Sequence, residues 1–576
     1  MKKVLNSVLA LMLASAMLVG CSSDEADSST SSSSSTSTSS SGSSEPVATI
    51  SAAAGAIEGE ATTEQVPIVV SVVNSASTDA SPYAMNTPSR GKTKEPLYAN
   101  LFYVQPGHYI EDVQPWLGKS ITQVDDYTWD IEIFDYIHDS QGNPITVDDI
   151  LWSYEYSFKN QEFLVYGTDV EYMKKVDDTH IELKTTKTIP GVIEKLVYNT
   201  ALTIVNQEWY ENASDEDKQM NPATTGRYTV ESNVSGSEIV LCAIDDADYW
   251  QTDASMIPDI CKANVKRIDL KVITEDAMRA IALENKEADV SAVTATNLHR
   301  FYDLDTGESL EGYNVFLGIY SSPGGSSLFC NMDPDGPSIL AQDVNLRKAA
   351  LYAINSEDFM LASGNTEQTA VVSHGAGSVY SDGYQESWDE NPDFFEYDPD
   401  KAHEFYAASG YADGEVEITV LMSISLYSDS QQSVVIAGLT EAGFNVNLLA
   451  VDQALFLNYR FDNDIWDIIF DYKGSGDNIA TGWDNLFNPV GYSNGSVCFT
   501  HDDHLLELLD AVVADTTDDN INAFNDYIKE QAIYKYTYTS QTISIAQDGI
   551  LEQYMTLSGF APQASTYSVD FVSAGE

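Results

Sequence analysis

Basic residues are scarce in this chain of 576 residues, which has 28 Lys plus Arg against 89 Asp plus Glu and a formal net charge of -61. Binding to nucleic acid depends on basic patches that neutralise phosphates, and this sequence has no such patch. We therefore exclude nucleic acid as a partner. The acidity is typical of a solvated, self-repelling surface that suits life outside a cell, and selection for cationic ligands is the alternative interpretation.

Cysteine is scarce as well. The five cysteines are Cys21, Cys242, Cys261, Cys330 and Cys498, with no Cys-x-x-Cys pair and no regular spacing. This pattern indicates no zinc site, and we predict no metal and no other cofactor. Apart from Cys21, the cysteines could form one or two disulfides, with Cys242 and Cys261 nearest in sequence, or stay as scattered buried thiols.

Long apolar runs are missing except at the start of the chain. Met1, Lys2 and Lys3 precede an apolar stretch that ends in Leu18-Val19-Gly20-Cys21. A bilayer-spanning helix needs about 20 apolar residues, and this stretch is interrupted by Asn6 and Ser7. The layout is typical of a bacterial lipoprotein signal, so we predict cleavage before Cys21 and a lipid on its sulfur.

Residues 22–44 contain almost only Ser, Thr, Asp, Glu, Ala and Gly. Such a segment has no large apolar side chain to bury and cannot offset the entropy lost on ordering. We predict a flexible tether with a mean reach of about 25 to 30 Å. The signal peptide is then residues 1–20, and the lipidated cysteine with the tether is residues 21–64.

Motifs of hydrolases are weak or missing. The chain has no Gly-x-x-x-x-Gly-Lys phosphate loop and no His-Glu-x-x-His helix. The run Gly491-Tyr492-Ser493-Asn494-Gly495 fits Gly-x-Ser-x-Gly, but its flanks indicate a loop and a short strand where a nucleophile elbow needs a strand and then a helix. We therefore predict that the protein is not an enzyme.

Three groups that resemble functional sites have simpler structural interpretations. His501-Asp502-Asp503-His504 holds four possible metal ligands, yet the spacing favours a loop or the start of a helix. The segment that begins with Asn331 resembles a calcium loop, but Gln342 stands where a bidentate Glu is needed, so we predict a turn. His138 is interpreted as a structural histidine at the end of a strand.

Hydrophobic patterns predict alternating strands and helices, hence α/β layers with some antiparallel sheet. The continuous run of residues 66–73 indicates a strand buried on both faces, and residues 127–133 alternate as an amphipathic strand. Thr146 is a good N-cap for a helix over 147–158. Further strands are predicted at 181–183, 239–241, 268–273 and 418–422, and further helices at 276–285, 344–353, 399–408, 433–442 and 505–513.

Specific motifs then carry a resemblance to a known family. They are Pro115-Trp116-Leu117, Asp126-Tyr127-Thr128-Trp129 and the turn His138-Asp139-Ser140-Gln141-Gly142-Asn143-Pro144-Ile145-Thr146-Val147-Asp148-Asp149, followed by Thr225-Gly226-Arg227-Tyr228, Phe329-Cys330-Asn331 and Tyr397-Asp398-Pro399-Asp400-Lys401-Ala402. From position 66 to 562 the chain resembles the large extracellular solute-binding proteins of ABC transporters, of the oligopeptide, dipeptide and nickel type (family 5). Arg227 stands where the family usually has Pro.

The resemblance implies an α/β, bilobal, periplasmic-binding-protein-like fold of type II, with three domains, mixed sheets and an interlobe hinge. It divides the chain into a first segment of lobe I (65–99), an additional domain of lobe I (100–200), a second segment of lobe I (201–320), lobe II (321–538) and a C-terminal return to lobe I (539–576). Hinge closure then encloses the ligand.

The resemblance also implies where the ligand lies. The carboxylate of Asp477 would receive the terminal ammonium of a peptide, and the backbone at Gly474, Ser475 and Gly476 would approach the peptide closely. On the opposite side Asn74, Ser75, Ala76 and Ser77 would line the cleft, with Trp483 and Tyr109 as further aromatic candidates.

The function implied is that of a substrate-binding lipoprotein, a monomer on the extracellular face of the cell membrane, or periplasmic if an outer membrane exists. It would capture short peptides and deliver them to an ABC permease that works with an ATPase subunit. The alternatives are oligosaccharide or metal-chelate ligands on the same scaffold, or a surface interaction or signalling lipoprotein without transport.

Overall fold

The structure is a computed structural model. It describes residues 61–62, 66–73, 79–83, 90–103, 113–160, 169–187, 192–198, 202–245, 247–256, 265–318, 324–474, 478–488, 498–547 and 571–572. Within these ranges no helix combines the length and the apolarity that a bilayer-spanning helix needs.

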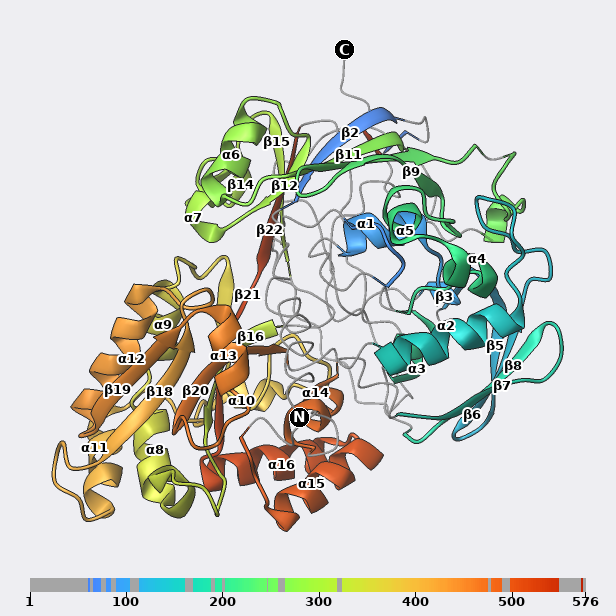
Figure 1. Cartoon of the computed structure of the whole chain (residues 1–576). Helices are drawn as coiled ribbons and strands as arrows, with labels where there is room; N and C mark the ends of the chain where they lie inside the picture. The colour runs from blue at the N-terminus through green and yellow to red at the C-terminus, as the bar shows by residue number, and fades with distance from the viewer. Residues whose placement is uncertain are drawn as a thin grey trace, which may run out of the picture.

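A seven-stranded mixed sheet lies at the top of Figure 1. The strand β2 (Val66–Val73) occupies its centre and pairs in parallel with a neighbour on each side. The order of strands is β15 (Tyr313–Gly318), β22 (Thr542–Gln547), β12 (Val290–Val293), β2, β11 (Val265–Val272), β10 (Glu238–Ala243) and β9 (Tyr228–Val234). A run of β-branched residues suits this central position, because both faces of such a strand are covered.

A six-stranded mixed sheet forms the lower left part of the molecule, between α12 and α8 (Figure 1). Its order is β17 (Ala370–Val372), β21 (Tyr534–Ser540), β16 (Gly324–Cys330), β20 (Ile468–Gly474), β18 (Glu417–Ser423) and β19 (Asn445–Val451). The strand β18, next to the edge strand β19, is parallel to both of its neighbours.

An antiparallel four-stranded sheet lies at the lower right in Figure 1, beside α2. Its order is β5 (Gly118–Asp125), β6 (Thr128–Ile133), β8 (His180–Thr185) and β7 (Val170–Lys175). Three two-stranded ribbons pair β1 (Ala61–Thr62) with β23 (Phe571–Val572), β3 (Phe102–Tyr103) with β4 (Gln114–Pro115), and β13 (Tyr302–Asp303) with β14 (Glu308–Ser309). We name the seven- and four-stranded sheets with their helices the first lobe, and the six-stranded sheet with its helices the second lobe.

Helices cover these sheets. In the first lobe they are α1 (Arg90–Leu97), α2 (Val147–Asn160), α3 (Val192–Val197), α4 (Gln207–Asn212), α5 (Asp215–Met220), α6 (Asp276–Glu284) and α7 (Ala295–Leu298). In the second lobe they are α8 (Val344–Tyr352), α9 (Ser356–Leu361), α10 (Glu386–Glu390), α11 (Pro399–Ala408), α12 (Asp429–Glu441), α13 (Gln453–Tyr459), α14 (Ile479–Phe487), α15 (Asp503–Ala514) and α16 (Asp518–Gln531). Each of the strands and helices predicted by residue range overlaps one of these elements. Cys498 and Phe499, in the flank predicted as loop and short strand, belong to no strand.

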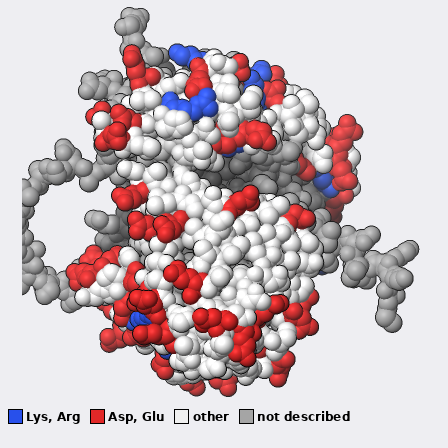
Figure 2. All heavy atoms as spheres, turned by 90° about the vertical axis from the view of Figure 1, so that its left-hand side faces the viewer, with Lys and Arg blue, Asp and Glu red and all other residues white. Residues whose placement is uncertain are grey.

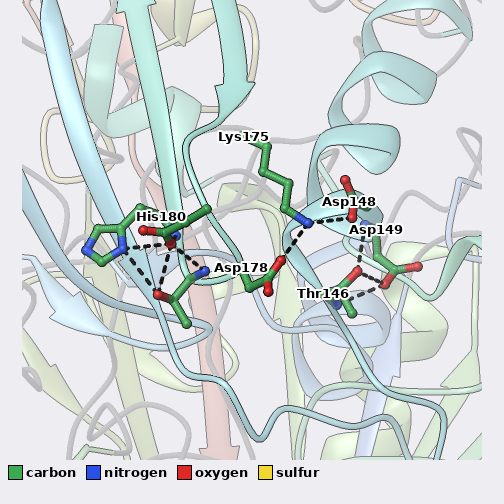
Figure 3. A network of polar contacts seen from close by, with 8 residues as sticks. Thr146, Asp148, Asp149, Lys175, Asp178 and His180 are labelled. Carbon is green, nitrogen blue, oxygen red and sulfur yellow. Dashed lines mark hydrogen bonds and ion pairs between the residues drawn. The ribbon is translucent and has the colours of Figure 1, made fainter.

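The turn before α2 has the geometry that its sequence predicts. Gly142 has a φ of +86°, a left-handed conformation that suits glycine, and the Asp139 carboxylate accepts the backbone N–H groups of Gln141 and Asn143. Thr146 then begins the helix: its backbone N–H and its hydroxyl both donate to the Asp149 carboxylate (Figure 3). This capping arrangement satisfies donors that a helix N-terminus leaves unpaired.

The Thr-Gly-Arg-Tyr motif marks a close approach between two segments. A side chain on Gly226 would place its Cβ 2.3 Å from the Pro96 carbonyl oxygen, so glycine is required there. Arg227, the departure from the family pattern, stacks its guanidinium 4.5 Å from the centre of the Tyr249 ring. Arginine at this position is therefore packed against an aromatic ring in the first lobe, where it does not disturb the motif's turn into β9.

The described cysteines are free thiols: Cys330 and Cys498 are buried and Cys242 is partly exposed. Burial raises the pKa of Cys330 to about 12, so this thiol stays protonated and unreactive at neutral pH. Cys261, the proposed partner of Cys242, lies outside the described residues. The sequence left open whether these cysteines form disulfides or stay as buried thiols, and Cys330 and Cys498 are buried thiols.

A lysine lies in the core of the second lobe. The Nζ of Lys535, on β21, donates to the carbonyl oxygens of Leu351 at 3.3 Å, Ile354 at 2.7 Å and Phe395 at 2.7 Å. Leu351 belongs to the last turn of α8, where unpaired carbonyls and the helix dipole favour a cation. Burial lowers the pKa of Lys535 to about 7, an effect that the charge of Glu396 partly offsets.

This depressed pKa predicts a pH-dependent stability. Lys535 is buried in the fold and has an ordinary pKa of about 10.4 in the unfolded chain, so between about pH 7 and pH 10 the unfolded state binds the extra proton and stability rises with pH. We expect the unfolding free energy of the native protein, relative to the Lys535→Met variant, to grow by roughly 2 kcal/mol from pH 7.5 to 9.5. Urea titrations of both proteins at both pH values measure this difference. A constant difference would mean that Lys535 keeps its proton when folded.

Candidate functional site

Strand register places the carboxyl ends of the first lobe's parallel strands at its border with the second lobe. The chain arrives from the second lobe and enters the sheet at Thr542, the first residue of β22. Val293, the last residue of β12, pairs with the next residue, Ile543, so β12 ends at the border between the lobes. Because β2 is parallel to β12, β2 also ends at this border, with Val73 as its last residue. Ligands of open α/β sheets bind outside such carboxyl ends, where the strand order reverses.

The second lobe presents the corresponding edge. Gly474, the last residue of β20, pairs with Gly324, the first residue of β16 after the chain crosses from the first lobe. Since β18 is parallel to β20, its carboxyl end at Ser423 lies at this edge too. The carboxyl edges of two sheets therefore face each other across the interlobe border, and Figure 2 shows the molecular surface hollowed between its upper and lower parts.

Most of the side chains predicted to bind the ligand follow these two edges in the chain. Asn74, Ser75, Ala76 and Ser77 come directly after β2, and Ser475, Gly476 and Asp477 come directly after β20. These residues and Tyr109 lie outside the described residues, so their roles remain predictions. The same applies to Cys21. Gly474 is described, and it ends β20 at the interlobe edge.

The helix α14 begins at this edge as well. Asn478 caps it by accepting the N–H of Ala480 at 3.0 Å, and the N–H of Ile479 donates to the carbonyl of Asp382 at 2.9 Å. Asn478 is 3% exposed, so the chain is held firmly one residue after Asp477.

Trp483, the aromatic candidate on α14, is a core side chain in this conformation. It has no solvent exposure, its indole N–H donates to the Ala376 carbonyl at 2.7 Å, and its ring packs 4.5 Å from that of Phe524. The ring therefore supports α14 from the interior of the second lobe and does not reach the solvent. A ligand contact by Trp483 remains a prediction that needs another conformation.

An ion pair joins the two lobes beside α14. Lys187, just after β8 in the first lobe, binds Asp484 on α14 and lies 3.2 Å from Asp169 Oδ1, just before β7. Both carboxylate residues are 7% exposed. Burial by itself lowers the pKa of Lys187, but the charges of Asp484 and Asp169 outweigh burial and raise it. The lysine is therefore held charged between an acid of its own lobe and an acid of the other lobe.

Apolar packing also spans the border near this pair. The buried side chains around the four-stranded sheet, such as Leu196 of α3, and those of the second lobe, such as Phe487 of α14, belong to one contiguous cluster. Figure 1 places α3 and α14 close to each other on either side of the border. The ion pair and this packing together describe a conformation in which the lobes are in contact on the α14 side.

The comparison with protein families fixes the class of this molecule. Residues 112–494 match the family described as bacterial extracellular solute-binding proteins, family 5. The chain belongs to this family. Its fold is the mixed α/β, bilobal fold of family 5 solute-binding proteins, as the sequence predicted.

Three similar proteins illustrate the range of the family. The nickel-binding protein NikA of Staphylococcus aureus is 23% identical over 214 residues, which cover 36% of this chain and 40% of NikA. The solved structure of DppA from Helicobacter pylori with the peptide STSA has a TM-score of 0.68 and 16% identity, covering 89% of this chain and 99% of that one. NikA from S. aureus with Ni(L-His)2 gives a TM-score of 0.64 and 16% identity, covering 88% and 100%.

Two residues at the border between the lobes of this solute-binding protein were missed by the sequence analysis. Ile424 follows β18, is 56% exposed and donates its N–H to the Val451 carbonyl at 2.9 Å, so it is an apolar candidate for ligand contact. Lys187 was missed because its partner Asp484 is 297 positions away. A lone exposed isoleucine and a lone lysine carry no local sequence signal.

The groups that resembled catalytic or metal sites have structural roles where they are described. Asp502 caps α15 by accepting the N–H groups of His504 and Leu505, which confirms a helix start. The segment after Asn331 is a turn, closed by the Gly336 N–H donating to the Asp333 carbonyl. His138 forms a β-bridge with Pro144. Ser493 lies outside the described residues.

The interlobe ion pair leads to a prediction on closure. In Lys187→Met two buried carboxylates, Asp169 and Asp484, would lose their shared counter-charge. We expect this to cost the contact between the lobes roughly 1 to 3 kcal/mol, or about a 5- to 150-fold shift toward separated lobes. Amide hydrogen exchange of α14 should accelerate accordingly, and small-angle scattering should report a larger radius of gyration.

Lys175 offers a matched control, because it also bridges two aspartates. It lies 2.8 Å from Asp148 and 3.0 Å from Asp178, within the first lobe and near the surface (Figure 3). Exposed pairs of this kind contribute about 0 to 1 kcal/mol, so Lys175→Met should leave the exchange of α14 nearly unchanged. Equal exchange of α14 in the two variants would disprove a specific role for Lys187.

Proposed function

We propose that this family 5 protein is the substrate-binding lipoprotein of an ABC importer, which captures short peptides between its lobes and delivers them to a membrane permease. The observation that carries the proposal is the pair of facing carboxyl edges in two lobes that are joined by two chain crossings and by the ion pair of Lys187 with Asp484. Two such lobes can close on a ligand. A ligand that binds the closed conformation more tightly than the open one shifts the equilibrium toward closure. Each lobe would move as a unit, with the domain limits expected from the sequence.

A peptide ligand suits this site for two reasons. β20 ends in a glycine, and the glycine-containing segment 474–476 would let a peptide backbone come close and pair with the chain, which gives affinity without dependence on side chains. Asp477 would supply the carboxylate for the terminal ammonium. The STSA complex of the structural neighbour DppA agrees with this ligand class, and at 16% identity the likeness is one of fold.

A nickel chelate is the second candidate. It is favoured by the similarity to S. aureus NikA in sequence and, for the complex with Ni(L-His)2, in fold. Within the described residues no group of three or more His, Cys, Asp and Glu side chains is placed to hold a metal ion. A test with both ligand classes separates the two candidates.

We also propose that the mature protein is a monomer, anchored through Cys21 to the extracellular face of the membrane, where a permease and its ATPase subunit receive the ligand. The Ser-rich segment 22–44 would keep the lobes clear of the lipid headgroups. The acidic surface, which Figure 2 shows on both halves of one face, would keep the tethered lobes soluble.

The lipid anchor can be tested directly. In Cys21→Ser the thiol that would carry the lipid is absent, and we expect the protein to move from the membrane fraction to the soluble or secreted fraction. Fractionation followed by immunoblotting measures the distribution. Membrane retention of the Ser variant equal to that of the native protein would refute the anchor.

The ligand class and the role of Asp477 can be tested in one calorimetric series. We expect free-amine tripeptides to bind the native protein, while N-acetylated tripeptides and Ni(L-His)2 bind weakly. In Asp477→Asn the ammonium would lose its counter-charge inside a closed cleft, at a cost of roughly 3 to 5 kcal/mol, so affinity for free-amine peptides should fall by about two to four decades. Acetylated and free peptides should then bind almost alike.

The controls separate the two parts of this proposal. Asp477→Asn keeps the side-chain volume, so thermal unfolding of the unliganded variant should match that of the native protein. An Asn variant that binds free-amine peptides within about threefold of the native protein would remove Asp477 from the site and leave peptide binding in place. Binding of Ni(L-His)2 without any binding of peptides would favour the nickel alternative.

A further inference from the structure

The two lobes also meet on the side of α7 and α9. Gly364, in the turn after α9, lies beside Thr296 of α7, because a Cβ added to Gly364 would lie 2.9 Å from the Thr296 hydroxyl oxygen. Close by, the side-chain amide of Gln368 donates to the Leu304 carbonyl oxygen at 3.5 Å. We name these four residues the rear contact. Two of them belong to the first lobe and two to the second lobe.

The second-lobe half of the rear contact is fastened to the crossing between the lobes. The side-chain amide of Asn365, the residue after Gly364, donates to the Ser540 hydroxyl at 3.2 Å. The N–H of Gln541 donates to the Thr369 carbonyl at 2.6 Å. Ser540 is the last residue of β21 and Gln541 directly precedes β22. The rear contact therefore lies next to the point about which the lobes can turn.

The first-lobe half is held firmly as well. α7 starts two residues after the end of β12, and the Asp276 carboxylate accepts the N–H of Thr294 at 2.9 Å and its hydroxyl at 2.7 Å. Leu298, at the other end of α7, is fully buried. Thr296 is itself exposed and stands on this fixed turn of helix. As a β-branched residue it has few rotamers by which its hydroxyl could move aside.

The rear contact and the ion pair of Lys187 lie on opposite sides of the crossing. In Figure 1 the strands β21 and β22 run between α7 and α9 on the left and α3 and α14 on the right. A rotation about the crossing that separates Lys187 from Asp484 therefore moves Thr296 toward Gly364. Since the rear contact is close to the crossing, a small displacement there corresponds to a larger one at α14.

Gly364 leaves just enough room for this arrangement. Its φ of +90° favours glycine, and the space that a side chain would need is already taken by Thr296. Gly410, which follows α11 in the same lobe, has a φ of +86°, but no atom lies within 4 Å of its added Cβ. The two glycines thus share a backbone conformation and differ in the contact with the other lobe.

We propose that the rear contact is a stop that resists opening of the lobes on the α14 side. Opening presses the side chain of Thr296 against the backbone of Gly364, and both are held by fixed turns, so the rotation is limited. Limited opening keeps the unliganded protein near the conformation that encloses a ligand. A larger population of that conformation raises the apparent affinity for whichever ligand the lobes enclose.

Gly364→Ala tests the stop, because the added methyl group overfills the rear contact and drives the α14 side together. In the unliganded protein we expect amide hydrogen exchange of α14 to be at least about fivefold slower than in Gly410→Ala. Thr296→Ala shortens the stop and should accelerate exchange of α14 relative to the native protein. In the Thr296→Ala background, Gly364→Ala should no longer slow the exchange, because the hydroxyl that it would meet is gone.

Gly410→Ala is the matched control, since it places alanine in the same unfavourable backbone conformation without a contact to the first lobe. Strain of this kind destabilises the fold and accelerates exchange, so slower exchange in Gly364→Ala has no origin in strain. Exchange of α14 in Gly364→Ala that is no slower than in Gly410→Ala would overturn the proposal, as would a slowing that persists in the Thr296→Ala background. The measurement uses no ligand, so its outcome is independent of the proposed peptide function.

Discussion

The continuity of β21 and β22 positions the rest of the molecule. β21 ends at Ser540 in the six-stranded sheet and β22 begins at Thr542 in the seven-stranded sheet, so a single residue, Gln541, separates them. The Gln541 N–H donates to the Thr369 carbonyl at 2.6 Å, which fixes this residue against the second lobe. With so short a link, the sheets can rotate relative to each other but can hardly separate. The carboxyl edges of the two sheets face each other because of this link and because of the strand registers within each sheet.

Charge is used sparingly inside this very acidic protein. Lys187 is shared between two buried aspartates, Lys535 is surrounded by carbonyl groups, and Arg460 pairs with Asp471 at 3.0 Å with both side chains 5% exposed. The chain has only 28 basic residues, and several of them are buried. Removing the partner of a buried charge costs much free energy, because the charge is then left unpaired away from water. The exposed surface, in contrast, keeps most of its acids without a counter-charge and remains soluble through repulsion.

The sequence predicted those parts of the structure that local patterns determine. β2 and α11 have the predicted bounds. A run of β-branched residues is typical of a buried strand, and Asp398 followed by Pro399 is typical of the start of a helix. β5 escaped prediction because its side chains are nearly all exposed and do not alternate. β21 was not predicted although Tyr534, Tyr536 and Tyr538 alternate with polar residues as in a half-buried strand. That pattern does not indicate that Lys535 and Thr537, on the other face, are buried as well.

The candidate site was predicted less completely, for a different physical reason. Motifs indicated which loops follow β2 and β20, and the registers of the two sheets place the ends of those strands at the interlobe border. The partner of Lys187, the exposed position of Ile424 and the buried position of Trp483 depend on contacts between segments that are far apart in the chain. Periodicity and spacing carry no information on such contacts, so only the folded chain reveals them.

The interleaved path of the chain has a consequence for the order in which the parts of the protein can fold. The strands of the second lobe lie between Gly324 and Ser540 in the chain, and the two ends of this stretch lie side by side because Gly325 pairs with Thr539. In the first lobe, β15 joins its sheet through β22, near the end of the described chain. The second lobe can therefore fold as soon as β21 has been made, whereas β15 cannot join its sheet before β22 is present. Until β22 is present, the sheet of the first lobe has an open edge at β12.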